Sequence, residues 1–128
     1  MQGGMGMDRA AMNDFCATLP GAAVSEPFGP GLDVWKVGTK MFAIVGMRNK
    51  GVSLKCETPD TAALLIDVGR AEKAPYLPRG GWVLIPWGRM EDAELKERLI
   101  TSYRTIRKTL TKKQQTALPP FPQSPPET

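Results

Sequence analysis

The sequence contains no histidine and only two cysteines among its 128 residues. The missing histidine excludes Ser-His-Asp and Cys-His catalysis, the HExxH zinc site and any histidine-ligated metal. Cys16 and Cys56 are far apart in the chain and form no CxxC pair, which argues against a structural zinc site or a redox pair. We therefore expect two reduced, buried thiols, with no metal and no other cofactor.

Long hydrophobic runs are also missing. No apolar stretch approaches the roughly 20 residues that a membrane-spanning helix needs, and the start, MQGGMGMDRAAMNDF, lacks the apolar region of a signal peptide. An apolar share of 41% and a charged share of 23% are ordinary for a globular protein. We expect a soluble, cytoplasmic chain with no membrane partner.

Apolar periodicity predicts a mixed α and β chain. Helical spacing marks residues 8–19 (N-cap Asp8, stop at Pro20-Gly21), a segment from Pro59 to Gly69 with Thr58 as N-cap, and residues 91–110. Strand-like runs cover 33–37, 41–47, 52–57 and 82–85. Residues 22–31 are expected to form a loop or an irregular edge strand, and residues 70–81 a loop. Pro86 is expected to close the last strand or to place it on a sheet edge.

The order of these segments predicts the fold class. Two consecutive hairpins within residues 33–57 argue against parallel βαβ winding, so we predict an α+β fold of two layers: an antiparallel sheet with helices packed on one face. The predicted organisation is a flexible N-terminus at 1–7, a single domain at 8–118 and a Pro-rich, disordered tail at 119–128.

No set of residues matches a standard catalytic motif. Ser53 and Ser102 are not part of a GxSxG elbow, and the glycine pairs fit neither GxGxxG nor GxxxxGK[ST]. Glu57 and Asp60 flank a predicted helix start, where acids stabilise the helix dipole. We therefore predict that the chain is not an enzyme. A deep pocket that held Glu57, Lys55 and Tyr103 together would reopen that question.

Basic residues provide the functional signal. The predicted nucleic-acid-binding residues lie on the strand hairpins and on the last helix: Lys40, Arg48, Lys50, Lys55, Arg104, Arg107 and Lys108. Arg48 and Lys50 occupy a predicted hairpin tip, a shape that can enter a DNA groove while its cations neutralise phosphates. The competing structural interpretation is that helix C-termini favour cations in any protein. The nucleic-acid interpretation requires both groups to lie on one face.

Several segments, in order, resemble a known family. They are FCATLPGA at 15–22, Lys40-Met41-Phe42-Ala43, VSLKCE at 52–57, Thr58-Pro59-Asp60, Trp82 after a loop rich in Pro and Gly, and Ser102-Tyr103. Together they resemble the MmcQ/YjbR family of small bacterial proteins, over roughly residues 8–118. Relatives often carry His and Asn just before the late Trp, whereas Pro78-Arg79-Gly80-Gly81 stand here.

The resemblance implies a compact α+β domain related in shape to CyaY-like and secretion-chaperone-like folds. It also implies a "double-wing" DNA-binding protein, and it supplies no catalytic residues. DNA is thus the first candidate partner. The alternative is a protein-interaction or adaptor domain without catalytic activity, which would dock a protein or a second copy through an apolar patch or a sheet edge.

Overall fold

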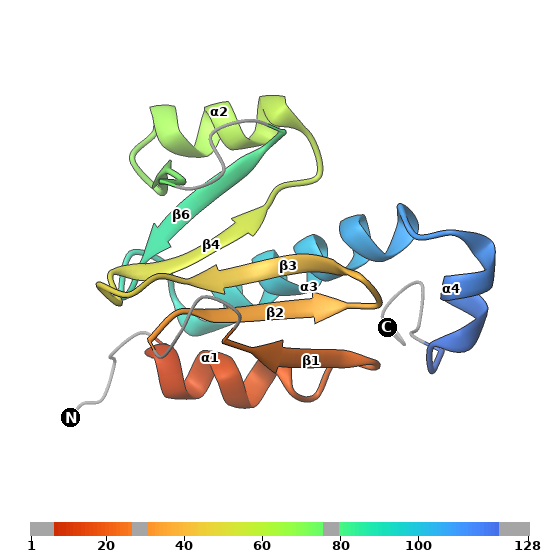
Figure 1. The fold of residues 1–128 in the computed structure, drawn as a ribbon. Coiled ribbons are helices and arrows are strands. Elements are labelled where there is room, and N and C mark those ends of the chain that lie inside the picture. The colour runs from red at the N-terminus through yellow and green to blue at the C-terminus, as the bar shows by residue number, and fades with distance from the viewer. Residues whose placement is uncertain (1–6, 27–30, 76–79, 121–128) are drawn as a thin grey trace.

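A computed structural model describes residues 7–26, 31–75 and 80–120. Its elements follow the chain in this order: α1 (Arg9–Cys16), β1 (Ala22–Ser25), β2 (Asp33–Val37), β3 (Lys40–Val45), β4 (Gly51–Lys55), α2 (Pro59–Asp67), β5 (Glu72–Lys73), β6 (Trp82–Pro86), α3 (Asp92–Lys108) and α4 (Lys112–Ala117). The strands form one antiparallel sheet in the order β1-β2-β3-β4-β6-β5 (Figure 1).

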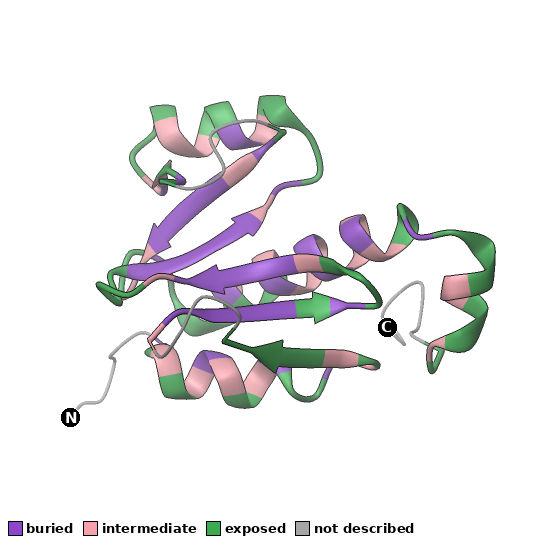
Figure 2. Cartoon of the chain, in the orientation of Figure 1, coloured by how far each residue is buried: buried purple, intermediate pink, exposed green. Residues whose placement is uncertain are grey.

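The predicted two-layer arrangement is confirmed. Figure 1 shows α3 running behind the sheet, where it contacts β2, β3 and β4, while α2 packs against β5 and β6. Strand alternation sends Val52 and Leu54 of β4, with Val83 and Ile85 of β6, toward these helices, and all four are fully buried. Figure 2 shows this burial concentrated in β2, β3, β4 and β6, whereas the edge strand β1 is mostly exposed.

The opposite face of the sheet carries a smaller apolar cluster. Val34 and Ile44 pair across β2 and β3, and together with Leu32 they form this second cluster. The same row continues through Ser53 and Leu84, because Ile44 pairs with Ser53 and Ser53 with Leu84. This face of the sheet is therefore apolar in its centre and becomes polar toward β5.

Helix ends follow the predicted capping residues. Asp8 caps α1 by accepting a hydrogen bond from the Ala11 amide at 2.9 Å, and Thr58 caps α2 by accepting one from the Thr61 amide at 3.1 Å. Pro59 occupies the first turn of α2, where its missing N–H costs nothing. Acids begin α3 and Arg107 and Lys108 end it, in line with the helix dipole.

A short ladder joins β3 to β4 in the middle of the sheet. β3 and β4 share only three residue pairs, from Ala43↔Leu54 to Val45↔Val52. Beyond the Ala43↔Leu54 pair, Ser102 of α3 connects the two strands. Its hydroxyl donates to the Phe42 carbonyl at 2.6 Å and accepts from the Lys55 amide at 2.9 Å. A helix residue thus satisfies two main-chain groups that the ladder leaves unpaired.

Residues 22–25 form the edge strand β1, in agreement with one of the two alternatives for residues 22–31. Two short elements differ from the sequence-based expectations: β5 lies inside the segment expected to be a loop, and α4 follows α3 as a separate helix. The strand that ends at Pro86 lies between β4 and β5 and is not an edge. Of the predicted termini, Met7 packs in the core, while residues 1–6 and 121–128 lie outside the described residues.

Candidate nucleic-acid interface

The turn between β3 and β4, at the left of Figure 1, carries two of the predicted cations. We call residues 46–50 the tip. The Asn49 amide donates to the Gly46 carbonyl at 3.0 Å, which closes the turn. Met47, Arg48, Asn49 and Lys50 are all exposed, and Met47 keeps 69% of its surface. The turn therefore presents a guanidinium, an ammonium and an apolar side chain to solvent.

Trp87 holds the tip in a fixed conformation. Asn49 has a φ of 55°, the left-handed region that costs a non-glycine residue energy and that Asn tolerates best. The Trp87 indole N–H donates to both the carbonyl and the side-chain oxygen of Asn49, at 2.9 and 3.0 Å, and the Trp87 amide donates to the Lys50 carbonyl at 3.1 Å. The end of β6 thereby ties down the turn that carries Arg48 and Lys50.

Arg48 and Lys50 of the tip take part in none of the ion pairs between described residues. The salt bridges among the described residues join Arg9 to Asp33, Arg70 to Glu94, Arg89 to Glu72 and Arg98 to Glu57. None of them involves Arg48 or Lys50. Four arginines thus have a carboxylate partner within the fold, whereas the tip keeps its positive charge available for an external anion.

The cations at the end of α3 have partners within the fold. Lys40 donates from Nζ to the Thr109 carbonyl and hydroxyl, at 3.2 and 3.0 Å, which satisfies the C-terminus of α3. Arg107 donates to the Tyr103 hydroxyl and to the Pro119 carbonyl, each at 2.6 Å. Arg104 is half-buried, whereas Lys108 is exposed and its side chain makes no hydrogen bond or ion pair with the other described residues. Cations near a helix C-terminus stabilise the helix in any protein. The contacts of Lys40 and Arg107 are therefore explained by this structural role.

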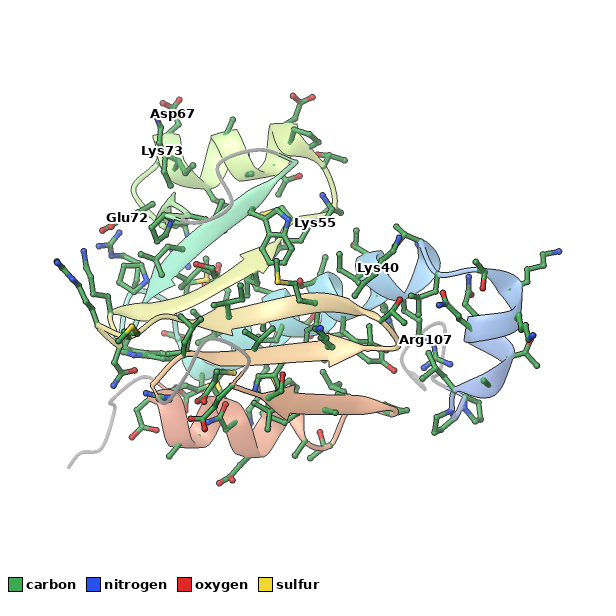
Figure 3. All side chains as sticks on the ribbon, viewed as in Figure 1. Lys40, Lys55, Asp67, Glu72, Lys73 and Arg107 are labelled. Carbon is green, nitrogen blue, oxygen red and sulfur yellow. The ribbon has the colours of Figure 1, made fainter. Side chains whose placement is uncertain are left out.

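The predicted residues therefore fall into two groups, so they do not form the joint surface of hairpin tip and last helix that the sequence-based interpretation requires, and the tip alone remains the candidate interface. Arg48 and Lys50 follow the end of β3, and Lys40 opens the same strand. β3 spans roughly 17 Å at about 3.3 Å per residue. Figure 3 shows Lys40 and Arg107 toward one end of the sheet, Glu72 and Lys73 toward the other, and Lys55 between them. Lys55 itself donates to the Gly80 carbonyl.

A pocket of about 290 Å³ opens beside the tip. Its lining comes from the turn, from β4 and β6, and from the β5 region: Gly46, Arg48, Asn49, Lys50, Gly51, Ser53, Glu72, Lys73, Pro75 and Leu84. Ser53, Leu84 and Glu72 pair in register across β4, β6 and β5, so their side chains share the face that the helices leave open. Lys73 pairs with Val83 and points to the other face.

Gly51 allows the two strands behind this pocket to approach closely. It pairs with Pro86, and a methyl group placed on its Cα would lie 2.1 Å from the Ile85 carbonyl oxygen. No side chain fits at that distance, since real Cβ contacts are never so short. The strand start at Gly51 thus fixes the position of the tip relative to β6 and Trp87.

The thiols, the Glu57 carboxylate and the Tyr103 hydroxyl lie outside this pocket and are buried or bound within the fold. Both thiols are buried, as expected, and burial raises the pKa of Cys16 to about 12. The Arg98 guanidinium holds the pKa of Glu57 below its usual value. Tyr103 packs its ring against Phe42 and donates its hydroxyl to the Pro20 carbonyl, and burial raises its pKa. Within the described ranges no three His, Cys, Asp or Glu residues gather as metal ligands would.

Two other surface features contrast with the tip. A hollow of about 310 Å³ lies between α1 and the start of α3, where Lys96 sits over the Phe15 ring at 5.6 Å. Exposed apolar side chains occur at Leu64 of α2, at the C-cap residue Val68 that follows it, and at Val24 of the edge strand β1. Across residues 7–26, 31–75 and 80–120, no helix is both long and apolar enough to span a bilayer.

These features define a small α+β protein with one antiparallel sheet, helices on one face and a basic tip that is hydrogen-bonded to Trp87. The family model for YjbR matches residues 17–105, so the chain belongs to the YjbR family. The crystal structure of the Deinococcus radiodurans protein DR2400, with a DUF419 domain, is similar at a TM-score of 0.77 and 24% identity, over 91% of this chain and 90% of that one. No curated protein matches the chain.

The sequence predicts that Arg48 and Lys50 lie on a hairpin tip, but it does not predict the Trp87 hydrogen bonds that hold this turn. Trp87 directly follows Pro86 in the sequence, and that position alone does not relate it to the turn at residues 46–50. Its hydrogen bonds to Asn49 depend on the register between β4 and β6, which brings Gly51 opposite Pro86. The available signal was the Asn-Lys-Gly turn followed at a distance by a tryptophan that breaks the apolar alternation, a pattern too general to specify the contact.

Proposed function

We propose that this chain is a non-catalytic nucleic-acid-binding module that engages the phosphate backbone through the tip. The observation that carries the proposal is the contrast in ion pairing: Arg48 and Lys50 have no carboxylate partner among the described residues. Two neighbouring cations without a carboxylate partner can each neutralise a phosphate. A nucleic-acid backbone supplies such phosphates at regular intervals.

The rigidity of the turn supports the same proposal. Binding is weaker when a loop must first be ordered, because the ordering costs conformational entropy. Trp87 and the left-handed Asn49 hold the turn before any ligand arrives. The exposed Met47 adds apolar contact surface of the kind that a turn inserted into a groove can use.

The protein-interaction alternative has weaker support. Leu64 and Val68 are exposed by 60% and 58% and lie four residues apart, on α2 and at its C-cap. Two side chains supply far less than the roughly 800 Å² per partner that a stable protein interface buries. The nucleic-acid proposal is therefore preferred, and the test below separates the two.

The test is fluorescence anisotropy with labelled duplex and single-stranded DNA at low salt. We expect Arg48→Gln with Lys50→Gln to weaken binding by roughly tenfold or more, since two phosphate contacts are lost. The matched control is Lys112→Gln with Lys113→Gln, which removes the same charge from exposed positions on α4. Equal losses in the two variants would mean that only net charge matters. No binding of either DNA would sink the proposal and favour a search for protein partners.

A further inference from the structure

The pocket beside the tip combines features that a bare phosphate contact does not need. Arg48 and Lys50 are exposed at its rim and Glu72 is half-exposed, whereas Ser53 and Leu84 in its lining are buried. A volume of about 290 Å³ is just below the range of about 300 to 1,000 Å³ that is usual for small-molecule sites. The space is therefore suited to one compact ligand that has an anionic end and an uncharged body.

The floor of the pocket offers one hydroxyl and an apolar surface. Ser53 and Leu84 are exposed by 3% and 8% and are direct partners across β4 and β6. No hydrogen bond within the described part of the chain involves the Ser53 hydroxyl, so it is free to bind a ligand. Pro75 adds a second apolar wall. A flat ring can lie against such a surface while its edge reaches the hydroxyl.

Glu72 gives the pocket an acceptor at the end away from the tip. Its carboxylate shares the pocket face and is tied to Arg89 at 3.1 Å, which fixes its position. An anionic ligand would be repelled if its charge lay beside this carboxylate. A ligand with an anion at Arg48 and Lys50 and hydrogen-bond donors at its other end satisfies both sites.

We infer that the pocket binds one nucleoside monophosphate unit, with its phosphate between Arg48 and Lys50, its ring against Leu84 and Pro75, and its hydroxyl or amino donors directed to Glu72 and Ser53. The unit can come from an unpaired nucleotide of a single strand or from a free nucleotide. In its single-strand form the inference rests on the proposed function and deepens it: the module would prefer single-stranded over duplex nucleic acid, since paired bases cannot enter the pocket.

The first experiment is an NMR amide titration of the full chain with adenosine 5′-monophosphate, with inorganic phosphate as the comparison. We expect saturable shifts at Ser53, Glu72 and Leu84 with the nucleotide, and shifts confined to residues 48–50 with phosphate. Glu72→Gln should change the affinities for phosphate and for the nucleotide in opposite directions. It removes a negative charge, so phosphate binding should strengthen, but it weakens the acceptor, so nucleotide binding should fall. Parallel gains for both ligands would overturn the inference.

The second experiment measures single-stranded and duplex oligonucleotides with Ser53→Leu, which fills the pocket and leaves the charge unchanged. Single-strand affinity should fall by at least about fivefold, the lower end of what one stacked base contributes, while duplex affinity stays unchanged. Thermal melting verifies that the variant is folded, and Ser53→Ala, which keeps the pocket open, is the matched variant.

The outcomes separate the two proposals. Unchanged single-strand binding in Ser53→Leu, with no nucleotide shifts in the wild type, removes the pocket inference and leaves the backbone-binding function. Nucleotide shifts without binding of any oligonucleotide remove the proposed function and identify the free nucleotide as the ligand. Absence of both kinds of binding removes both proposals.

Discussion

Ser102 is a single buried hydroxyl on which the junction between the two halves of the sheet depends. It is fully buried on α3, donates to the Phe42 carbonyl and accepts from the Lys55 amide. β3 and β4 diverge at this point, so neither main-chain group has a strand partner there. The helix therefore supplies through one side chain the pairing that the sheet lacks.

Ser102→Ala should lower the free energy of unfolding by about 1–3 kcal/mol, because it leaves a buried carbonyl and a buried amide without a partner. The higher helix propensity of alanine offsets only about 0.5 kcal/mol of that loss. Urea denaturation measures the difference. Ser25→Ala on the exposed edge strand β1 is the control and should change stability by less than about 0.5 kcal/mol. An equal effect of the two substitutions would falsify this account of the junction.

Asp33 connects α1 to β2 through charge. Its carboxylate accepts from the Arg9 guanidinium at 2.7 Å and from the side-chain Nδ2 of Asn13 at 3.1 Å, while the side-chain Oδ1 of Asn13 accepts from the Trp35 indole N–H at 2.8 Å. The Arg9 hydrogen bond, which outweighs desolvation, lowers the pKa of Asp33. A carboxyl with a lowered pKa stabilises the fold above its unfolded pKa of about 4, and that stability is lost as the pH falls through the folded pKa.

Asp33→Asn should therefore be less stable than the wild type at neutral pH, by about 1 kcal/mol, and should lose less stability on acidification. Thermal melting from about pH 5 to about pH 2 covers the window in which a carboxyl of lowered pKa takes up its proton. Asp67→Asn removes an exposed carboxylate at the end of α2 and should keep the wild-type slope. If Asp33→Asn shows the wild-type slope as well, the Arg9 contact does not contribute to acid stability.

At the scale of elements, the conformation of the tip is maintained by β6. Asn49 stays in the left-handed region because Trp87 binds its carbonyl and its side chain at once. Backbone strain of this kind persists only where surrounding contacts enforce it, and it is common at ligand sites. The turn is therefore better described as an extension of the β4–β6 pair than as a free loop.

Asn49→Ala should destabilise the protein by about 1–2 kcal/mol, because alanine pays the full cost of a left-handed backbone. Asn49→Gly loses the same side-chain acceptor but adopts a positive φ freely, so it should cost less. Urea denaturation ranks the two variants, and anisotropy with single-stranded DNA reports whether the turn still binds. A glycine variant less stable than the alanine variant would show that φ does not control the turn.

The elements that the sequence predicts well are those with strong local signals. α3 carries an apolar stripe through Leu95, Leu99, Tyr103 and Ile106, and each of these residues is buried in the structure. β5 has only two residues, and it is a strand because β6 offers an edge beside it. α4 has no buried residue, and a capping box at Thr111 and Gln114 stabilises its start. Such elements depend on tertiary or polar contacts that apolar periodicity does not report.

At the scale of the whole molecule, the candidate site also divides into features that local sequence signals predict and features that depend on tertiary contacts. The exposure of Arg48 and Lys50 is predictable because the sequence marks a turn there, and side chains in a turn are exposed to solvent. The separation of Lys40 from Arg48 depends on where β3 begins and ends, and the pocket depends on pairing between β4, β6 and β5. Sequence patterns identify the charges, whereas only the assembled sheet shows which of them can act together.

The position of the charges predicts the salt dependence of binding. If only Arg48 and Lys50 neutralise phosphates, the logarithm of the association constant for duplex DNA should fall with the logarithm of salt concentration with a slope near −2. Engagement of the α3 end as well would make the slope about −4 or steeper. We expect the shallower value, because Lys40 and Arg107 already bind Thr109, Tyr103 and Pro119.

The variant Lys40→Gln with Lys108→Gln provides the decisive comparison, since it removes two charges at the α3 end and leaves the tip intact. Its slope should equal that of the wild type, whereas Arg48→Gln with Lys50→Gln should flatten the slope toward zero. If the slope becomes shallower in both variants, one strand of nucleic acid bridges both ends of β3. The module would then bind along the sheet and not at its tip, and the pocket would lie beside the path of the strand and not at its end.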